Sequence, residues 1–239
     1  MAVSSVFVIA GNAGQGKSTV AVNLAAAFCS LGFDVLLVDA DLKTPRVGYY
    51  IGMPLVEKTI QEILLGMRPL EKAIYQTASG IKLLLSSLND VNTPHPSVLL
   101  PKLKNLADII LVDTPTNDEL WKQHGQLVLV TIPDFPSVFN LRKQYDLKKA
   151  KLVVNRARCD SVDLPVENIK NLLNCSILGW LASDLNMREA LRKGLPFVDL
   201  YPDSIVSNEF KSIAAKLMNV EYTSPVKKVS LLMKLGLEK

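Results

Sequence analysis

The sequence predicts a single α/β domain in which a doubly wound, mostly parallel β-sheet carries helices on both faces. Three observations support this. Short apolar stretches rich in β-branched residues alternate along the chain with stretches of helical apolar spacing. These short stretches are apolar throughout, which is typical of parallel strands buried on both faces. The chain has 239 residues, 49% hydrophobic and 21% charged, a size and composition that suit one such domain.

Apolar runs bounded by turn residues mark the expected strands. They are residues 5–10, 34–39, 81–85, 108–113, 126–132, 151–155 and 176–181. Helical periodicity between them marks the expected helices. They are residues 17–31, 57–66, 69–77, 97–106, 136–149, 164–173, 185–193 and 204–219. Gly32 is placed to end the first helix as a C′ glycine, and Pro94 and Pro96 mark a loop over 90–96.

The stretch after the first strand carries the strongest functional signal. Residues 11–18 match the phosphate-binding pattern G-x-x-x-x-G-K-S, and they lie between a strand and a helix, as this motif requires. Backbone N–H groups of such a loop and the helix N-terminus attract phosphate, lysine reaches the β- and γ-phosphates, and serine ligates Mg²⁺. We therefore predict nucleotide-binding residues here: Gly11, Asn12, Ala13, Gly14, Gln15, Gly16, Lys17, Ser18 and Thr19.

Three acidic residues follow expected strands, at the edge where ligands of open α/β sheets bind. Asp113 ends an apolar strand and is the expected carboxylate for Mg²⁺, with Asp39 as a second candidate for the metal shell. Asp41 is the candidate for orienting the attacking water, beside Lys17 as the other catalytic residue. The alternative is that Asp39 and Asp41 only cap turns.

Composition limits the other possibilities. The net charge of +4 is compatible with an anionic surface, but no dense Lys/Arg patch is present. The three cysteines are scattered without a C-x-x-C pair, which disfavours a zinc or iron–sulfur site and fits a reducing compartment. No apolar run approaches the roughly 18 residues of a membrane span. The first apolar run leads into the phosphate loop and is expected to be a core strand, not a signal peptide.

Four segments in order resemble the MinD/ParA-type ATPases: residues 11–19, Val38-Asp-Ala-Asp41, 111–115 and Val153-Val-Asn-Arg156. Residues 178–184, 188–190 and 194–196 also resemble that family. The resemblance covers roughly residues 3–220. It implies an ATP-dependent, Mg²⁺-dependent switch that forms a nucleotide-bound homodimer. It also implies that Asn155 binds the adenine edge, that Arg156 lies at the nucleotide, and that Asp184 lies in a nucleotide-flanking loop. A turn role for Asn155 is the alternative.

The chain departs from the family pattern at three positions. Asn12 replaces a signature lysine that reaches the partner's phosphates, and a neutral side chain cannot supply that charge. The segment Pro115-Thr116-Asn117 replaces Pro-Ala-Gly, which removes an easy backbone donor for the γ-phosphate. Ala182 lies where the family often has proline. The first two departures favour slow hydrolysis. Arg46 is a candidate to supply the missing positive charge to a partner's phosphates. The alternative is an arginine that is only solvated in its loop.

Residues 222–239 form an expected C-terminal tail after a domain of residues 1–221. On a helix, its apolar residues share one broad arc with basic flanks, the pattern of an interfacial membrane helix. It resembles the membrane-targeting tail of the MinD branch. The residues predicted to face an anionic membrane are Val229, Leu232, Met233, Leu235 and Leu237, with Leu231 on the same arc. Packing on the domain or on a sister subunit is the alternative.

These observations predict a cytoplasmic, peripherally membrane-associated ATPase of the MinD-like branch. It would bind ATP and Mg²⁺, dimerise, and position or regulate a protein partner in cell division or spatial organisation. Two alternatives stay open. One is a nucleotide-binding scaffold with little turnover, and the other is a ParA-like DNA-partitioning ATPase.

Overall fold

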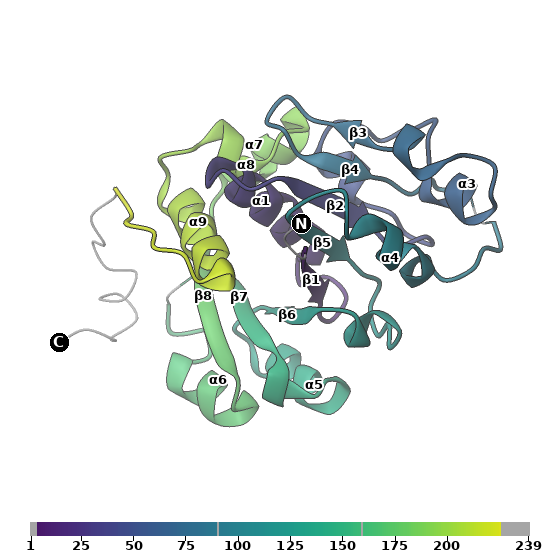
Figure 1. Ribbon diagram of the computed structural model, residues 1–239. Helices are drawn as coiled ribbons and strands as arrows, with labels where there is room; N and C mark the ends of the chain where they lie inside the picture. Colours follow the sequence, from purple (N-terminus) through teal and green to yellow (C-terminus); the bar gives the residue numbers. More distant parts are fainter. Residues whose placement is uncertain (1–3, 90, 159, 226–239) are drawn as a thin grey trace.

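The computed structural model describes residues 4–89, 91–158 and 160–225 (Figure 1). Its eight-stranded sheet has the order β3-β4-β2-β5-β1-β6-β7-β8, and every neighbouring pair is parallel except β3 and β4. The strands are β1 (Ser5–Ala10), β2 (Val35–Asp39), β3 (Tyr75–Gln76), β4 (Lys82–Leu84), β5 (Ile109–Asp113), β6 (Gln126–Thr131), β7 (Lys151–Ala157) and β8 (Ser176–Ala182). This confirms the predicted fold class.

Helices cover both faces of the sheet. They are α1 (Lys17–Ser30), α2 (Val47–Tyr50), α3 (Ile60–Leu64), α4 (Leu100–Leu103), α5 (Phe135–Gln144), α6 (Val166–Leu173), α7 (Asn186–Lys193), α8 (Phe197–Leu200) and α9 (Ile205–Met218). Four short 3₁₀ turns complete the described elements: η1 (Leu70–Lys72), η2 (Pro96–Leu99), η3 (Trp121–Gln123) and η4 (Leu147–Lys149).

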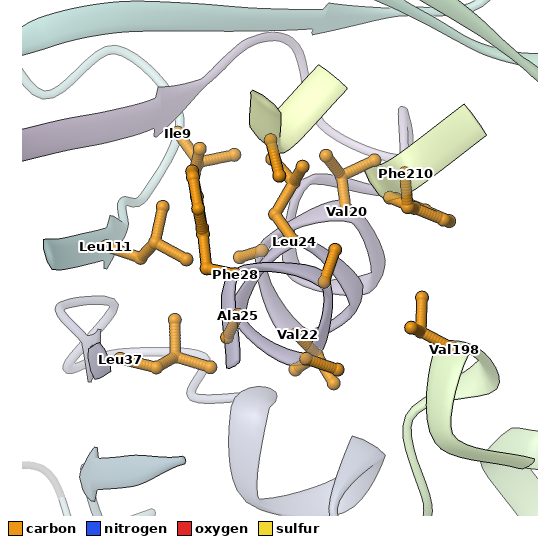
Figure 2. Packing of buried hydrophobic residues seen from close by; sticks show 14 of the residues in the cluster. Ile9, Val20, Val22, Leu24, Ala25, Phe28, Leu37, Leu111, Val198 and Phe210 are labelled. Atoms are coloured by element: carbon orange, nitrogen blue, oxygen red, sulfur yellow. The ribbon is translucent and has the colours of Figure 1, made fainter. Parts of the chain in front are cut away.

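Strand side chains alternate between two buried clusters because successive residues point to opposite faces. Phe7 and Ile9 pack with α1 and α9, whereas Val8 and Ala10 pack with the side that carries α3 to α6. Figure 2 shows the first cluster, in which Leu24 and Phe28 of α1 lie among strand residues such as Leu111. Helix α1 is therefore buried almost all round, which fixes the phosphate loop at its N-terminus.

The register brings three strand ends together. Asp39 on β2 is the Cα partner of Asp113 on β5, and Asp113 is in turn the partner of Ile9 on β1. All three strands are parallel, so their carboxyl ends lie at one edge of the sheet. The phosphate loop starts from the same edge, directly after β1.

Several predicted boundaries need correction. The helix expected over 69–77 is wrong: η1 occupies three residues of it, and β3 then pairs antiparallel with β4 at the sheet edge. In place of the helix expected over 97–106, the structure has η2 followed by the short α4. A continuous helix from Pro96 would hold Pro101 in its interior, where proline lacks the N–H that the helix needs. Helices α2 and α8 lie in segments where no helix was expected. Gly32, with φ of +89°, confirms its predicted place after the first helix.

Within the described residues, no helix combines the length and hydrophobicity needed to cross a membrane. The tail residues predicted to face a membrane, Val229 to Leu237, lie outside the described residues. The division at residue 221 therefore stays a prediction.

Candidate nucleotide site

The phosphate loop has backbone geometry that glycine alone adopts easily. Gly11, Gly14 and Gly16 have φ of +144°, +77° and +89°. A Cβ at Gly11 would lie 2.3 Å from the Val130 carbonyl oxygen, and one at Gly16 would lie 2.4 Å from Asn155 Nδ2. Ala13 and Gly14 are exposed at the tip of the loop, whereas Gln15 is buried beneath it. The loop therefore offers an open backbone surface supported from below.

Lys17 begins α1 and turns its ammonium back over the loop. Its Nζ donates to the Asn12 carbonyl oxygen at 3.3 Å and to Thr116 Oγ1 at 3.1 Å. Burial lowers the pKa of Lys17, while the negative charges of Asp113 and Asp41 act in the opposite direction. The ammonium thus lies in a half-buried position between the phosphate loop and the acidic strand ends.

The two strand-end carboxylates are fully enclosed. Burial raises the pKa of Asp113 to about 6, opposed by a hydrogen bond from Ser18 and by the charge of Lys17. Burial and the neighbouring Asp113 raise the pKa of Asp39 well above its ordinary value. Asp39 Oδ2 accepts the backbone N–H groups of Arg46 and Val47, both at 3.1 Å. Asp39 therefore also holds the start of α2, as the turn-capping alternative expects.

This arrangement fits a hydrated magnesium ion brought by a nucleotide. Asp39 Oδ1 and Asp113 Oδ1 are buried, and neither has a hydrogen-bond partner among the described residues. Mg²⁺ usually takes one or two carboxylates and completes its shell with water and phosphate. The described part of the chain contains no group of three His, Cys, Asp or Glu side chains that would hold a metal alone. Ser18, Asp39 and Asp113 are therefore suited to a metal that arrives with phosphate.

Asp41 lies beyond β2 and is only half-buried. Its Oδ1 accepts the Thr44 backbone N–H at 2.9 Å, and its Oδ2 accepts the Thr44 hydroxyl at 2.7 Å. Its charge also acts on Lys17 and Asp113. Asp41 therefore caps a turn in this structure and lies close to the phosphate loop, and its role at the attacking water stays a prediction.

Two loop side chains tie the phosphate loop to the start of α5. Asn12 Nδ2 donates to the Ser137 carbonyl oxygen at 3.1 Å, and Gln15 Nε2 donates to Ser137 Oγ at 3.1 Å. Gln15 Oε1 also accepts the Ile132 backbone N–H at 2.8 Å. Asn12 therefore makes a contact within its own chain, and its other amide atom, Oδ1, is buried without a partner in the described residues.

Residues at the end of β7 also support the phosphate loop. Asn155 Nδ2 donates to the Gln15 carbonyl oxygen at 2.8 Å, and Arg156 donates to the Gly14 carbonyl oxygen at 3.2 Å. Asp184 caps the start of α7 by accepting the Asn186 backbone N–H at 2.8 Å. The structure thus brings Asn155 and Arg156 to the phosphate loop. Their predicted contacts with nucleotide, and that of Asp184, stay predictions.

Sequence reasoning missed Tyr145, which follows α5. Its buried hydroxyl accepts the Gly11 backbone N–H at 3.2 Å and also the backbone N–H of Asn117. Asn117 has φ of +63°, so asparagine keeps the left-handed backbone that glycine would adopt there. The prediction that this position lacks an easy backbone donor for the γ-phosphate stays a prediction. Its N–H is directed at Tyr145. No local motif marks Tyr145, because its role depends on the fold.

A strand–glycine loop–helix unit with a lysine over the loop and two carboxylates at neighbouring strand ends defines a P-loop nucleotide-binding protein. The chain belongs to the CobQ/CobB/MinD/ParA nucleotide-binding domain family, whose model matches residues 6–197. The resemblance to MinD/ParA-type ATPases is thereby confirmed.

Similar proteins span nearly the full length. An uncharacterised ATP-binding protein of Methanocaldococcus jannaschii is 28% identical, covering 94% of this chain and 91% of that protein. The septum site-determining protein MinD of Synechocystis is 28% identical, covering 89% of this chain and 88% of that protein. The solved structure of MinD with Mg-ADP from Pyrococcus horikoshii is 25% identical with a TM-score of 0.75, covering 90% of this chain and 95% of that chain.

Proposed function

We propose that this protein is a MinD-like ATPase switch that binds MgATP, dimerises around it, and hydrolyses it slowly. The observation that carries the proposal is the meeting of Lys17, Ser18 and Asp113 at one sheet edge, where two buried carboxylate oxygens have no partner among the described residues. The bound Mg-ADP of the Pyrococcus relative supports the same ligand class.

Each residue would contribute a definite part of the chemistry. Backbone N–H groups of the glycine loop and the Lys17 ammonium would stabilise phosphate charge. Ser18, Asp113 and Asp39 would hold Mg²⁺, which neutralises charge on the β- and γ-phosphates. Asp41 would orient the attacking water after leaving Thr44, the partner it has in this structure. Asp41 and Thr44 both lie in the short segment between β2 and α2.

The relatives and the sequence of the tail support a proposal for the cellular role. MinD relatives are named for septum-site determination, and a solved Aquifex aeolicus assembly pairs MinD with MinC. We infer a cytoplasmic, peripherally membrane-associated protein that positions or regulates a protein partner, with residues 229–237 as the membrane contact. One tail inserting a few aliphatic side chains binds with roughly millimolar to 0.1 mM affinity. Two tails in one dimer add avidity of about 100-fold or more.

Co-sedimentation with anionic vesicles tests this role. The full chain and a variant lacking residues 226–239 are compared with MgATP, MgADP and no nucleotide. We expect only the full chain with MgATP to sediment. Equal sedimentation in all nucleotide states would contradict the switch, and sedimentation of the shortened chain would contradict the tail assignment. DNA binding that survives the deletion would favour the ParA-like alternative.

A nucleotide-binding scaffold with little turnover is the second candidate. It is favoured by Asn12, whose side chain is held by α5 of its own chain and carries no charge. Phosphate release measured with and without vesicles separates the two. Turnover near background under every condition would favour the scaffold.

A further inference from the structure

Lys17 is hydrogen-bonded to a side chain that the phosphate-binding motif does not include. An ammonium has three protons to donate. One goes to the Asn12 carbonyl oxygen, inside the loop, and another to Thr116 Oγ1 at 3.1 Å. Thr116 belongs to the segment after β5, three residues beyond Asp113. The ammonium therefore joins the phosphate loop to the segment that follows the Mg²⁺ carboxylate.

The Thr116 hydroxyl keeps a proton of its own. A hydroxyl has one donor and two acceptor positions, and Lys17 uses an acceptor position. Thr116 is exposed, so its O–H lies at the surface that an arriving ligand would meet. A phosphate oxygen bound by the Lys17 ammonium would lie near this hydroxyl, because both groups are already in contact.

Two contacts fix the backbone beside Thr116. Asn117 adopts a left-handed conformation, and its N–H donates to the buried hydroxyl of Tyr145. The same hydroxyl accepts the N–H of Gly11 at 3.2 Å, so the segment and the phosphate loop share one anchor. On the other side, the Thr114 hydroxyl donates to the Ile9 carbonyl oxygen at 2.9 Å. Thr116 therefore lies between two anchored residues, which holds its side chain toward Lys17.

We propose that Thr116 is a specificity-determining residue whose hydroxyl donates to the terminal phosphate of a nucleoside triphosphate and thereby favours triphosphate over diphosphate. This rests on the proposed function, since it assigns a further ligand contact to the same site. The position explains how the chain contacts a γ-phosphate although Asn12 carries no charge and the Asn117 N–H is taken by Tyr145. The diphosphate lacks the group that Thr116 reaches, so its affinity does not depend on the hydroxyl.

Affinity measurements on substituted proteins test this assignment. Thr116→Val removes the hydroxyl at nearly constant shape, and Thr116→Ser keeps it. Thr223→Val, at an exposed threonine beyond α9, controls for surface substitution. Calorimetry gives the Kd values of adenylyl imidodiphosphate and of ADP, each in the presence of Mg²⁺. We expect Thr116→Val to weaken the triphosphate analogue about 10-fold or more, the usual effect of losing a hydrogen bond to a charged group, and to change ADP less than about 2-fold. Thr116→Ser and Thr223→Val should match the unsubstituted protein.

The possible outcomes separate this inference from the proposed function. Equal weakening of both ligands by Thr116→Val would mean that the residue only supports the loop, which overturns the inference. An unchanged triphosphate affinity would overturn it too. Failure of the unsubstituted protein to bind either ligand would overturn the proposed function itself and this inference with it.

Discussion

Asp39 and Asp113 are in-register Cα partners on β2 and β5, and one carboxylate oxygen of each is buried without a hydrogen-bond partner in the described part of the chain. Two such carboxylates repel each other, and burial disfavours their charged forms. The pair therefore destabilises the protein without ligand and becomes favourable when a cation lies between or beside the two groups. This relationship links the fold, the metal and the pH dependence of stability.

The Asp113→Asn variant should be more stable than the parent at neutral pH. The folded-state pKa of Asp113 is raised to about 6, so the folded protein holds this proton more tightly than the unfolded chain does. The stabilisation that comes from the proton bound by Asp113 is present at low pH and is lost as pH rises through about 6. The gap in melting temperature between variant and parent should widen from pH 5 to 7, measured without Mg²⁺ or nucleotide. A gap that stays constant with pH would contradict this.

Gly16→Ala should weaken nucleotide binding, whereas Gly32→Ala should not. Both glycines have φ of +89°, so both variants bear the same left-handed strain of about 1–2 kcal/mol. Only at Gly16 does the new Cβ meet Asn155, at 2.4 Å from Nδ2, while nothing lies within 4 Å at Gly32. Urea denaturation and ADP binding measure both effects. Equal ADP affinities for the two variants would contradict the placement of Gly16 and Asn155 at the nucleotide.

Tyr145→Phe should destabilise the protein by about 1–3 kcal/mol, the cost of leaving a buried donor unpaired. The hydroxyl accepts from Gly11 and Asn117, and the lost oxygen leaves both N–H groups without that partner. Tyr201→Phe is the matched control, since its hydroxyl donates to the half-exposed carboxylate of Glu189. We expect the control to lose clearly less in urea denaturation. The reverse order would argue against Tyr145 as the shared anchor.

Asn12→Lys should increase dimerisation in the presence of MgATP. The substitution removes the contact with the Ser137 carbonyl oxygen, at a cost of about 1 kcal/mol, and frees a charged side chain to reach a partner's phosphates. Asn12→Met loses the same contact without adding charge and is the control. Light scattering after gel filtration measures mass. If both variants show the same mass as the parent, position 12 does not control assembly.

The sequence alone predicted the sheet, the central helix and the phosphate loop because these features are encoded by local patterns. Apolar strands and the G-x-x-x-x-G-K-S spacing need no tertiary information, and Asp113 followed from its place at a strand end. The contacts around the loop could not be predicted in this way. Tyr145 and Ser137 meet it only because β6 pairs with β1, which places α5 beside the loop. Strand β3 was missed because its two residues depend on pairing with β4.

Calorimetric titration with MgATP, comparing the unsubstituted chain with Lys17→Ala, tests the central claim most directly. Lys17 is the loop side chain expected to neutralise phosphate charge, and in this structure its ammonium donates to the Asn12 carbonyl oxygen and to Thr116 Oγ1. We expect the parent to bind in a Mg²⁺-dependent manner and Lys17→Ala to lose at least about 10-fold in affinity, as for a lost charged hydrogen bond. Full ATP affinity and turnover in Lys17→Ala would contradict the account.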